Sequence, residues 1–297
     1  MKILLLGSNG QVGQAFQELA NSDHWPLAWD LMTWDRAKAD LSKVESLSVL
    51  LSQLQPSLII NAAAYTQVDK AESEPSLCEM INSKAPAALA AYCKSAGIPL
   101  VHYSTDYVYE GSGTDLHVET EAHQPQSVYG KTKAQGDEAI VKSGCKYLIF
   151  RTSWVYSHQG KNFVKTMLKL GSERDVLKVV NDQVGSPSYA PDLAEFTLDA
   201  IMQAVEQDSD GDDFPSGIYH LCNSGFTTWY EFAKTILSKE YPLVKVEGIP
   251  TTEYPTPAKR PLNSRLSLAK LEETFLIHPR SWKEALQDCL RKCSEKI

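Results

Sequence analysis

The sequence is poor in patterns that bind metals or cross membranes. Its six cysteines form no CxxC pair and no zinc spacing, and its seven histidines include no HExxH motif. We therefore interpret the cysteines as free thiols of a reducing cytosol. The apolar run Ile3–Leu6 is too short for a signal peptide or a membrane span, which predicts a cytoplasmic protein without a membrane partner.

Basic residues are outnumbered, with 29 Lys and Arg against 37 Asp and Glu, for a formal net charge of −8. This balance disfavours nucleic acid as a partner, because a phosphate backbone needs a basic face. A nucleotide ligand stays compatible, since it needs only a local basic spot. With 297 residues, 43% of them hydrophobic, the chain can bury a sizeable core.

The first segments of the chain predict a dinucleotide-binding unit. Ile3–Leu6 predicts a strand buried on both faces, and a G-x-x-G-x-x-G loop and a helix follow at once. Gly7 suits a tight turn, Gly10 lets the backbone approach a pyrophosphate, and Gly13 lets the helix pack against the sheet. The free N–H groups at the start of this helix can bind the phosphates.

A second apolar segment, Pro26–Trp29, ends in Asp30. An acid at the tip of the second strand can accept hydrogen bonds from an adenosine ribose, although a solvated loop acid is the alternative. Arg36 and Lys38 follow closely and could instead meet a 2′-phosphate. The choice between NADH and NADPH therefore stays open.

Strands and helices alternate along the first half, which predicts an α/β fold with a doubly wound parallel Rossmann sheet. A buried strand over 57–61 leads into three alanines, 62–64, which could let a flat ligand lie against the backbone or simply pack a tight turn. Ligands bind at the carboxyl ends of such strands. We expect four residues at these ends: Gly7, Asp30, Ala64 and Thr105.

The stretch 100–133 combines an apolar strand, a hydroxyl at its tip and a helix that carries Tyr129 and Lys133. Residues four apart share a helix face, so the phenol and the ammonium can point into one cleft. The same spacing recurs at Tyr230/Lys234 and at Tyr241/Lys245. The pair Tyr241/Lys245 contains a proline, which predicts a turn or strand rather than a helix. The pair Tyr230/Lys234 is not preceded by a strand that ends in Ser or Thr.

Several motifs carry a resemblance to a known family, and they run in order from the first residues to past residue 260. They are Gly7–Gly13, Asn61–Thr66, Val68–Pro75, His102–Val108, Tyr129–Lys133, Arg151–Tyr156, Asn181–Gly185, Tyr254–Pro257 and Arg260–Pro261. With them the chain resembles the extended short-chain dehydrogenases/reductases, and among these the dTDP-4-dehydrorhamnose reductase family. The resemblance implies reduction of dTDP-4-dehydro-L-rhamnose to dTDP-L-rhamnose with NADPH or NADH.

The resemblance also implies roles for single residues. Thr105, Tyr129 and Lys133 take the catalytic hydroxyl, acid and lysine positions. Contacts with the dinucleotide are implied for Gly7, Gly10, Gln11, Val12, Gly13, Asp30, Asp40, Leu41, Ala63, Ala64, Tyr65, Tyr103, Tyr129 and Lys133. Contacts with the substrate are implied for Thr105, Asp106, Trp154, Asn181 and Arg260.

The residues themselves leave some of these roles open. Strand alternation lets only one of Ser104 and Thr105 face the cofactor, and the family match favours Thr105. Trp154 could stack on a sugar or pack in the core. Asn181 could bond a sugar or close its own turn, and Arg260 could bind a diphosphate or lie on the surface.

Hydride addition to a ketone leaves negative charge on its oxygen, which needs a proton and hydrogen-bond donors. We predict Tyr129 as the general acid and Thr105 as the donor that orients the carbonyl. A free phenol has a pKa near 10, and an ammonium about 5 Å away at an effective dielectric near 20 favours phenolate by roughly 3 kcal/mol. We therefore expect Lys133 to lower the pKa of Tyr129.

One position departs from the family pattern. Some members have an acidic residue two positions after the last glycine, where it contributes to a Mg²⁺ site between subunits. This chain has Ala15 there. We expect no metal-bridged dimer of that kind, and leave open any other use of Mg²⁺ and the oligomeric state, a homodimer included.

For domain organisation, we expect a dinucleotide-binding Rossmann domain over residues 1–153, to which 176–205 returns. A smaller nucleotide-sugar-binding domain would comprise 154–175 and 206–297, with an acidic, turn-rich linker at 207–216. Two other functions suit the same scaffold. A nucleotide-sugar epimerase or dehydratase would retain its cofactor through each cycle, and a non-catalytic NAD(P)-binding regulatory subunit would bind a partner enzyme without turnover.

Overall fold

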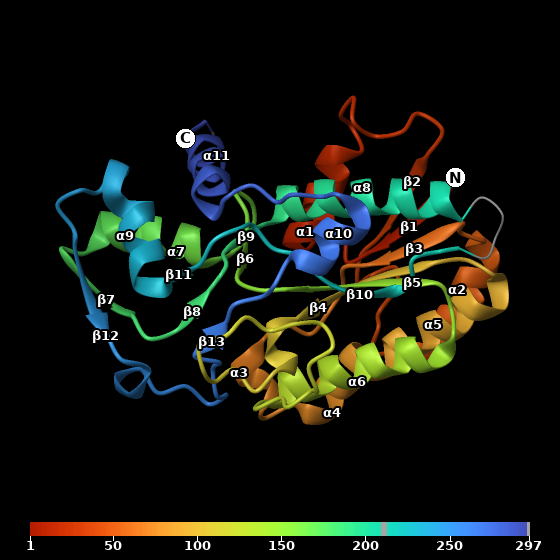
Figure 1. Cartoon of the computed structure of the whole chain (residues 1–297), viewed down its shortest axis with the longest axis horizontal. Coiled ribbons are helices and arrows are strands. Elements are labelled where there is room, and N and C mark those ends of the chain that lie inside the picture. The colour runs from red at the N-terminus through yellow and green to blue at the C-terminus, as the bar shows by residue number, and fades with distance from the viewer. Residues whose placement is uncertain (209–212, 296–297) are drawn as a thin grey trace.

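The apolar segments form one six-stranded parallel sheet in a computed structural model that describes residues 1–208 and 213–295. The strands lie in the order β10-β5-β4-β3-β1-β2 (Figure 1). Their bounds are β1 (Lys2–Leu6), β2 (Asp30–Trp34), β3 (Leu58–Asn61), β4 (Leu100–Thr105), β5 (Tyr147–Thr152) and β10 (Gly217–His220). The predicted doubly wound parallel sheet is confirmed.

Helices cover both faces of this sheet (Figure 1). Side chains alternate along β1, so that Ile3 and Leu5 enter one core while Leu4 and Leu6 enter the other. The first core lies under α1 (Gln11–Leu19), α8 (Ala190–Gln207) and α10 (Ala269–Phe275). The second lies under α2 (Val44–Leu54), α5 (Ala85–Ala96) and α6 (Val128–Ser143).

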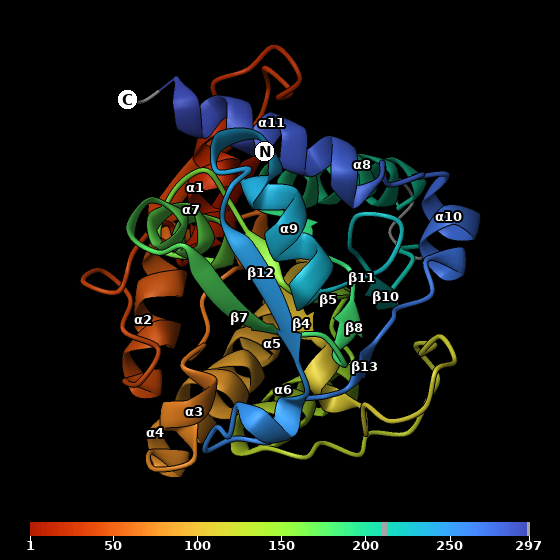
Figure 2. The same cartoon turned by 90° about the vertical axis from the view of Figure 1, so that its left-hand side faces the viewer.

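A smaller lobe lies beside the sheet, on the left in Figure 1 and facing the viewer in Figure 2. Its core gathers side chains of α7 (Phe163–Glu173), α9 (Trp229–Glu240) and α11 (Trp282–Ser294) against the parallel pair β7 (Val176–Val180) and β12 (Lys245–Ile249). Three of its elements begin at capping side chains: Asn162 for α7, Thr228 for α9, and Ser281, in a full capping box, for α11.

Short strands connect the lobe to the large sheet. The pair β6 (Val155–Tyr156) and β9 (Ser188–Tyr189) is parallel, and β11 (Thr227–Thr228), β8 (Val184–Gly185) and β13 (Asn263–Ser264) form a three-stranded sheet. Short helices follow β3, namely α3 (Val68–Ala71), α4 (Pro75–Glu79) and a π-helical turn, Met80–Lys84. Single 3₁₀ turns span Asp106–Val108 and Thr251–Glu253.

The structure places part of the expected second domain in the large sheet. Strand β10 pairs with β5, and α10 packs on the core under α8, although both lie within 206–297. Residues 209–212 of the expected linker lie outside the described residues. Within the described ranges, no helix is both long enough and apolar enough to cross a membrane.

Candidate active site

The glycine loop joins β1 to α1 and folds tightly on itself and on the segment after β3. Gly7 has φ +82°, and a Cβ there would lie 2.7 Å from the backbone nitrogen of Ala63. A Cβ at Gly13 would lie 2.2 Å from the carbonyl oxygen of Gly7, so this glycine packs the helix against the loop rather than against the sheet. Gly10 is the N-cap of α1 and offers no side-chain cap.

These features fit a dinucleotide. The first N–H groups of α1 have no capping side chain, and the helix dipole favours an anion there. The loop also lies where β1 is flanked by β2 and β3, the point at which the strand order reverses. Such switch points are where open α/β sheets bind ligands.

Asp30 lies at the wrong end of β2 for a ribose contact, which corrects the sequence prediction. The strand begins at Asp30 and ends at Trp34, whose carbonyl accepts a hydrogen bond from the N–H of Gly7 (2.9 Å). About 13 Å of strand therefore separates Asp30 from the loop. Asp35 follows Trp34 and takes the place of the acid, and its carboxylate accepts a hydrogen bond from Asn9 (3.3 Å) in the loop.

The residues after Asp35 are partly committed to local contacts. Arg36 is exposed, with its Nε 3.7 Å from Asp40, and the Lys38 ammonium lies 5.3 Å from the Trp34 ring centroid. The Asp40 carboxylate accepts hydrogen bonds from the N–H and the hydroxyl of Ser42, which lower its pKa. The predicted contact Leu41 is buried in the core under α2.

Four other predicted cofactor residues surround the loop. The backbone of Ala63 touches Gly7, and the half-buried Ala64 follows it. Gln11 donates to the carbonyl of Val155 (3.3 Å), tying the start of α1 to β6, and Val12 packs at the edge of the first core.

Two predicted cofactor tyrosines are already bonded to the protein. The Tyr65 hydroxyl donates to Glu74 (2.7 Å), and burial raises its pKa to about 12. The Tyr103 hydroxyl bonds Thr197 of α8 (2.7 Å), so this phenol is held on the α8 side of the sheet.

The structure brings Thr105 and Tyr129 together at the carboxyl end of β4. Burial raises the pKa of Tyr129 from its usual value near 10, and the neighbouring Thr105 hydroxyl opposes this shift. The ring of Tyr107 lies edge-on against Tyr129, with the centroids 5.4 Å apart. Tyr129 is therefore a protonated phenol over the whole neutral range.

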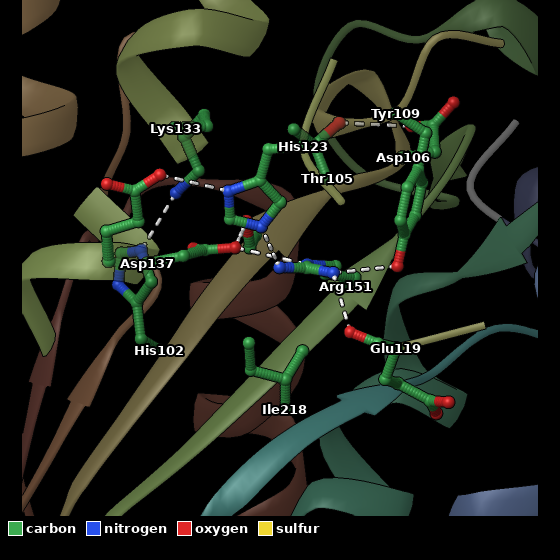
Figure 3. A network of polar contacts seen from close by, with 12 residues as sticks. His102, Thr105, Asp106, Tyr109, Glu119, His123, Lys133, Asp137, Arg151 and Ile218 are labelled. Carbon is green, nitrogen blue, oxygen red and sulfur yellow. Dashed lines mark hydrogen bonds and ion pairs between the residues drawn. The ribbon is translucent and has the colours of Figure 1, made fainter. Parts of the chain in front are cut away.

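Lys133 bonds other groups in the protein alone, and the net pKa of Tyr129 is raised rather than lowered, so an effect of Lys133 on this phenol stays a prediction. Its Nζ lies 3.0 Å from Nε2 of His102 and donates to the carbonyl of Tyr103 at 2.6 Å. The lysine is 1% exposed, and burial lowers its own pKa to about 8. Figure 3 shows Lys133 directed at the His102 ring.

Ser104 and Thr105 serve different partners. The Ser104 hydroxyl donates to Asp137 (2.9 Å), which also accepts from Nε of Arg151 (3.1 Å) in a fully buried ion pair. Arg151 in turn donates to the hydroxyl of Tyr109 (2.7 Å), as Figure 3 shows. Ser104 thus belongs to the support beneath the site, and Thr105 is the hydroxyl beside Tyr129.

Asp106 is buried beside Thr105. It accepts hydrogen bonds from the hydroxyls of Thr105 and Ser264, the latter on β13. Burial raises the pKa of Asp106 to about 6, and the two hydroxyls oppose this shift. The bond to Ser264 ties the smaller lobe to the end of β4.

The predicted sugar-stacking residue Trp154 is itself stacked. Its indole lies on Trp229, with ring centroids 3.6 Å apart and planes 12° apart. The Trp229 Nε1 donates to Gln183 (3.1 Å), and its other contacts include the Phe163 ring. Trp154 has φ +50°, and a Cβ at Gly185 would lie 2.9 Å from its ring.

Arg260 and Asn181 lie apart from this stack. Arg260 forms an ion pair with Asp69 (2.6 Å), and its Nη1 is buried with no hydrogen-bond partner among the residues that the structure describes. Asn181 is exposed at the end of β7, and its N–H donates to the carbonyl of Ile249 (2.9 Å). Arg260 has a donor available to a ligand. The bond of Asn181 uses only its backbone, so a sugar contact of its exposed side chain stays a prediction.

Sequence reasoning missed three residues of this site. Asp35 was missed because the second strand was placed too early. Trp229 carried no cleft signal of its own. His102 stands in a quoted motif, but nothing in its spacing predicted a contact with Lys133.

No metal site accompanies these groups in the described ranges, where no three His, Cys, Asp or Glu side chains are grouped suitably. Ala15, at the position of the family's acidic residue, is buried in the core under α8.

Comparisons with known proteins agree in pointing to one family. The family model of the RmlD substrate binding domain matches residues 1–295. The dTDP-4-dehydrorhamnose reductase of Escherichia coli K12 is 41% identical over 298 residues, with 98% of each chain covered. Two crystal structures of proteins with this name are similar, and each match covers 98% of this chain and 99% of the other. The structure from Clostridium acetobutylicum is 37% identical in sequence, with a TM-score of 0.89. The structure from Bacillus anthracis, solved in complex with NADP, is 34% identical, with a TM-score of 0.86. The chain belongs to the dTDP-4-dehydrorhamnose reductase family.

Proposed function

We propose that this chain reduces the 4-keto group of dTDP-4-dehydro-L-rhamnose to dTDP-L-rhamnose with NADPH or NADH. The observation that carries the proposal is that Thr105 and Tyr129 lie together at the carboxyl end of β4, in a chain of this family. The curated relative from Escherichia coli is named for this reduction.

The glycine loop and the start of α1 would hold the diphosphate of the dinucleotide. The cofactor supplies the hydride when it is bound. Asp35 would accept hydrogen bonds from the adenosine ribose, and the exposed Arg36 would approach a 2′-phosphate. Both nicotinamide cofactors therefore suit the loop, and the Bacillus anthracis relative was solved with NADP.

Tyr129 would act as the general acid. Burial keeps its phenol protonated, which is the state that a proton donor needs. The Thr105 hydroxyl, which donates to Asp106 in the free protein, would turn to the substrate carbonyl and orient it. As charge develops on the substrate oxygen, the phenol O–H bond breaks, the new O–H bond forms on the substrate, and the phenolate left behind takes a proton from water.

Residues of the smaller lobe would hold the nucleotide sugar. Trp154 and Trp229 offer an aromatic face next to the end of β5, and Asp106 lies beside the proposed carbonyl site. The unpartnered Nη1 of Arg260 suits a diphosphate oxygen. In this proposal the dinucleotide domain comprises residues 1–153 together with α8, β10 and α10, and the substrate domain comprises most of the rest. Strand β7, expected in the first domain, belongs to the second, because it pairs with β12 in the core of the smaller lobe.

The deciding experiment follows NADPH and NADH oxidation with freshly generated dTDP-4-dehydro-L-rhamnose and identifies the product by mass. A reductase oxidises one cofactor per sugar and adds two hydrogens to the product. An isomeric or dehydrated product without net oxidation would instead favour the epimerase or dehydratase. No turnover, together with a stable partner enzyme in a pull-down, would favour the regulatory subunit.

A further inference from the structure

The ion pair of Asp69 and Arg260 joins a helix of the large sheet to a loop of the smaller lobe. Asp69 lies in α3, which follows β3, and Arg260 lies between β12 and β13. Nη2 of the guanidinium donates to Oδ2 of the carboxylate at 2.6 Å. Because a guanidinium is planar and rigid, this bond fixes the direction of its other donors as well.

The second oxygen of the same carboxylate holds the loop by its backbone. Oδ1 of Asp69 accepts a hydrogen bond from the N–H of Ala258 (3.2 Å), a residue that is 1% exposed. The Thr256 hydroxyl donates to the carbonyl of Ala258 (2.8 Å) and closes the turn before Arg260. Both oxygens of Asp69 are therefore engaged, and an amide at this position would keep only one of the two acceptors.

The guanidinium keeps one donor unused. Nη1 of Arg260 is buried and has no hydrogen-bond partner within the described ranges 1–208 and 213–295. Folded proteins rarely leave a buried N–H unpaired, so such a donor calls for a ligand or a water that completes it. Arg260 thus has one side committed to Asp69 and one side open to an anion.

Tyr107 connects this ion pair to the proposed site of reduction. Burial raises the pKa of Tyr107 most, and the charges of Arg260 and Asp69 act on it in opposite directions, so both lie close to this phenol. The ring of Tyr107 lies edge-on against Tyr129, with the centroids 5.4 Å apart. In a nucleotide 4-ketosugar, the diphosphate and the ketone lie on opposite sides of one sugar ring. An arginine one aromatic ring away from the proposed acid suits that spacing.

We propose that Asp69 is a positioning residue that aims Nη1 of Arg260 at the diphosphate of the substrate. The inference rests on the proposed function, in which Arg260 supplies the diphosphate contact. Asp69 itself touches neither substrate nor cofactor in this scheme. It acts through the guanidinium, which it holds in the direction of the bound diphosphate before the substrate arrives.

Two effects of the Asp69 carboxylate oppose each other. Its charge repels a diphosphate, whereas its bond holds the donor that a diphosphate needs. The Asp69 side chain is 42% exposed, so water and salt screen the repulsion. Nη1 of Arg260 is buried, so its bond to a phosphate oxygen is screened far less, and a guanidinium already held in place loses little rotamer freedom on binding. Positioning therefore outweighs repulsion, and loss of the carboxylate should weaken binding.

The test is calorimetric titration of the full chain with dTDP, in wild type and in Asp69→Asn. We expect Kd for dTDP to rise about tenfold in the variant, because the charge-assisted bond of Arg260 is no longer aimed. Kd for NADPH, measured by fluorescence, should stay at the wild-type value and shows that the variant is folded. Unchanged or tighter binding of dTDP in Asp69→Asn overturns the inference, since the carboxylate would then be neutral or merely repulsive.

A double variant separates positioning of Arg260 from support of the loop. In an Arg260→Met background there is no guanidinium to aim, so Asp69→Asn should not weaken dTDP binding further and should strengthen it if anything. The same loss in both backgrounds would mean that Asp69 only holds the backbone of Ala258, and overturns the inference.

Gln126→Ala is the matched control for the loop. It removes the acceptor that Lys259 uses at 3.1 Å, a second tether of the same segment, and changes no charge. Kd for dTDP should stay at the wild-type value, and a loss as large as that of Asp69→Asn overturns the inference.

Turnover distinguishes this inference from the proposed function. With dTDP-4-dehydro-L-rhamnose, Asp69→Asn should raise KM about tenfold and leave kcat nearly unchanged, because the lost contact lies away from the ketone. A reductase whose dTDP affinity does not depend on Asp69 overturns the positioning role alone. A chain that shows the expected dTDP affinities but oxidises no cofactor overturns the reductase function alone.

Discussion

The same Tyr–Lys spacing occurs on two helices of this protein, in opposite surroundings. On α6, Lys133 is buried and bonds His102, and burial lowers its pKa. On α9, Lys234 lies 5.0 Å from the centroid of the Tyr230 ring and bonds Glu231, which raises its pKa. Helical spacing decides only that two side chains share a face. What that face packs against decides their chemistry.

The largest contrast should appear in turnover. Tyr129→Phe removes the proposed acid and should lower kcat by about 10³–10⁴-fold while cofactor affinity, measured by fluorescence titration, changes little. Tyr230→Phe is the matched control and should keep the wild-type rate. Near wild-type turnover in Tyr129→Phe would remove Tyr129 from the mechanism.

The next contrast is in stability. Arg151→Met leaves Asp137 buried without its partner and should lower the free energy of unfolding by about 3 kcal/mol, measured in urea. Lys234→Met removes an exposed ion pair and should leave the free energy of unfolding nearly unchanged. Similar losses in both variants would mean that burial does not distinguish the two regions.

A pH-dependent contrast should follow from Asp106. The pKa of Asp106 in the folded protein is raised to about 6, above the value of 3.8 expected in the unfolded chain. The folded state therefore favours the protonated carboxyl. The contribution of Asp106 to the free energy of unfolding is fully present below pH 4 and is lost as pH rises through 6. Asp106→Asn should therefore be more stable than wild type by about 1–3 kcal/mol at pH 7.5. The two proteins should converge below pH 4, and a constant difference across this range would contradict the buried carboxyl.

The smallest contrast separates the two ends of β2. Asp35→Asn should raise KM for NADH by about tenfold, because it loses a charge-assisted bond to the ribose. The KM for NADPH should rise less, because the substitution also removes the repulsion between the Asp35 carboxylate and the 2′-phosphate. Asp30→Asn should leave both values unchanged, and a rise there would restore Asp30 to the site.

Sequence reasoning succeeded where burial on both faces leaves a continuous apolar run. The strands β1, β3 and β4 were found in this way, and the α/β alternation predicted the parallel sheet. It failed at β2, an edge strand whose residues are mostly half-exposed. The apolar segment before it is a loop in which Trp25 packs into the core while Leu27 is fully exposed, and no local pattern separates such a loop from a strand.

The site was predicted in outline but not in its electrostatics. The position of Tyr129 and Lys133 on one helix followed from spacing, and the choice of Thr105 followed from alternation and the family resemblance. The raised pKa of Tyr129 did not, because its largest cause is burial. The contact of Lys133 with His102, which lies 31 residues away in sequence, was not predicted either. Contacts of that kind are set by the packing of α6 on β4.

The Trp154–Trp229 stack has an optical consequence. Two indoles at 3.6 Å couple their transition dipoles and should give the free protein a paired band in circular dichroism and a quenched, shifted emission. A sugar that arrives at these rings could slide between them or displace one of them. Either event would uncouple them, so the protein carries an intrinsic spectroscopic reporter of substrate arrival that is independent of hydride transfer.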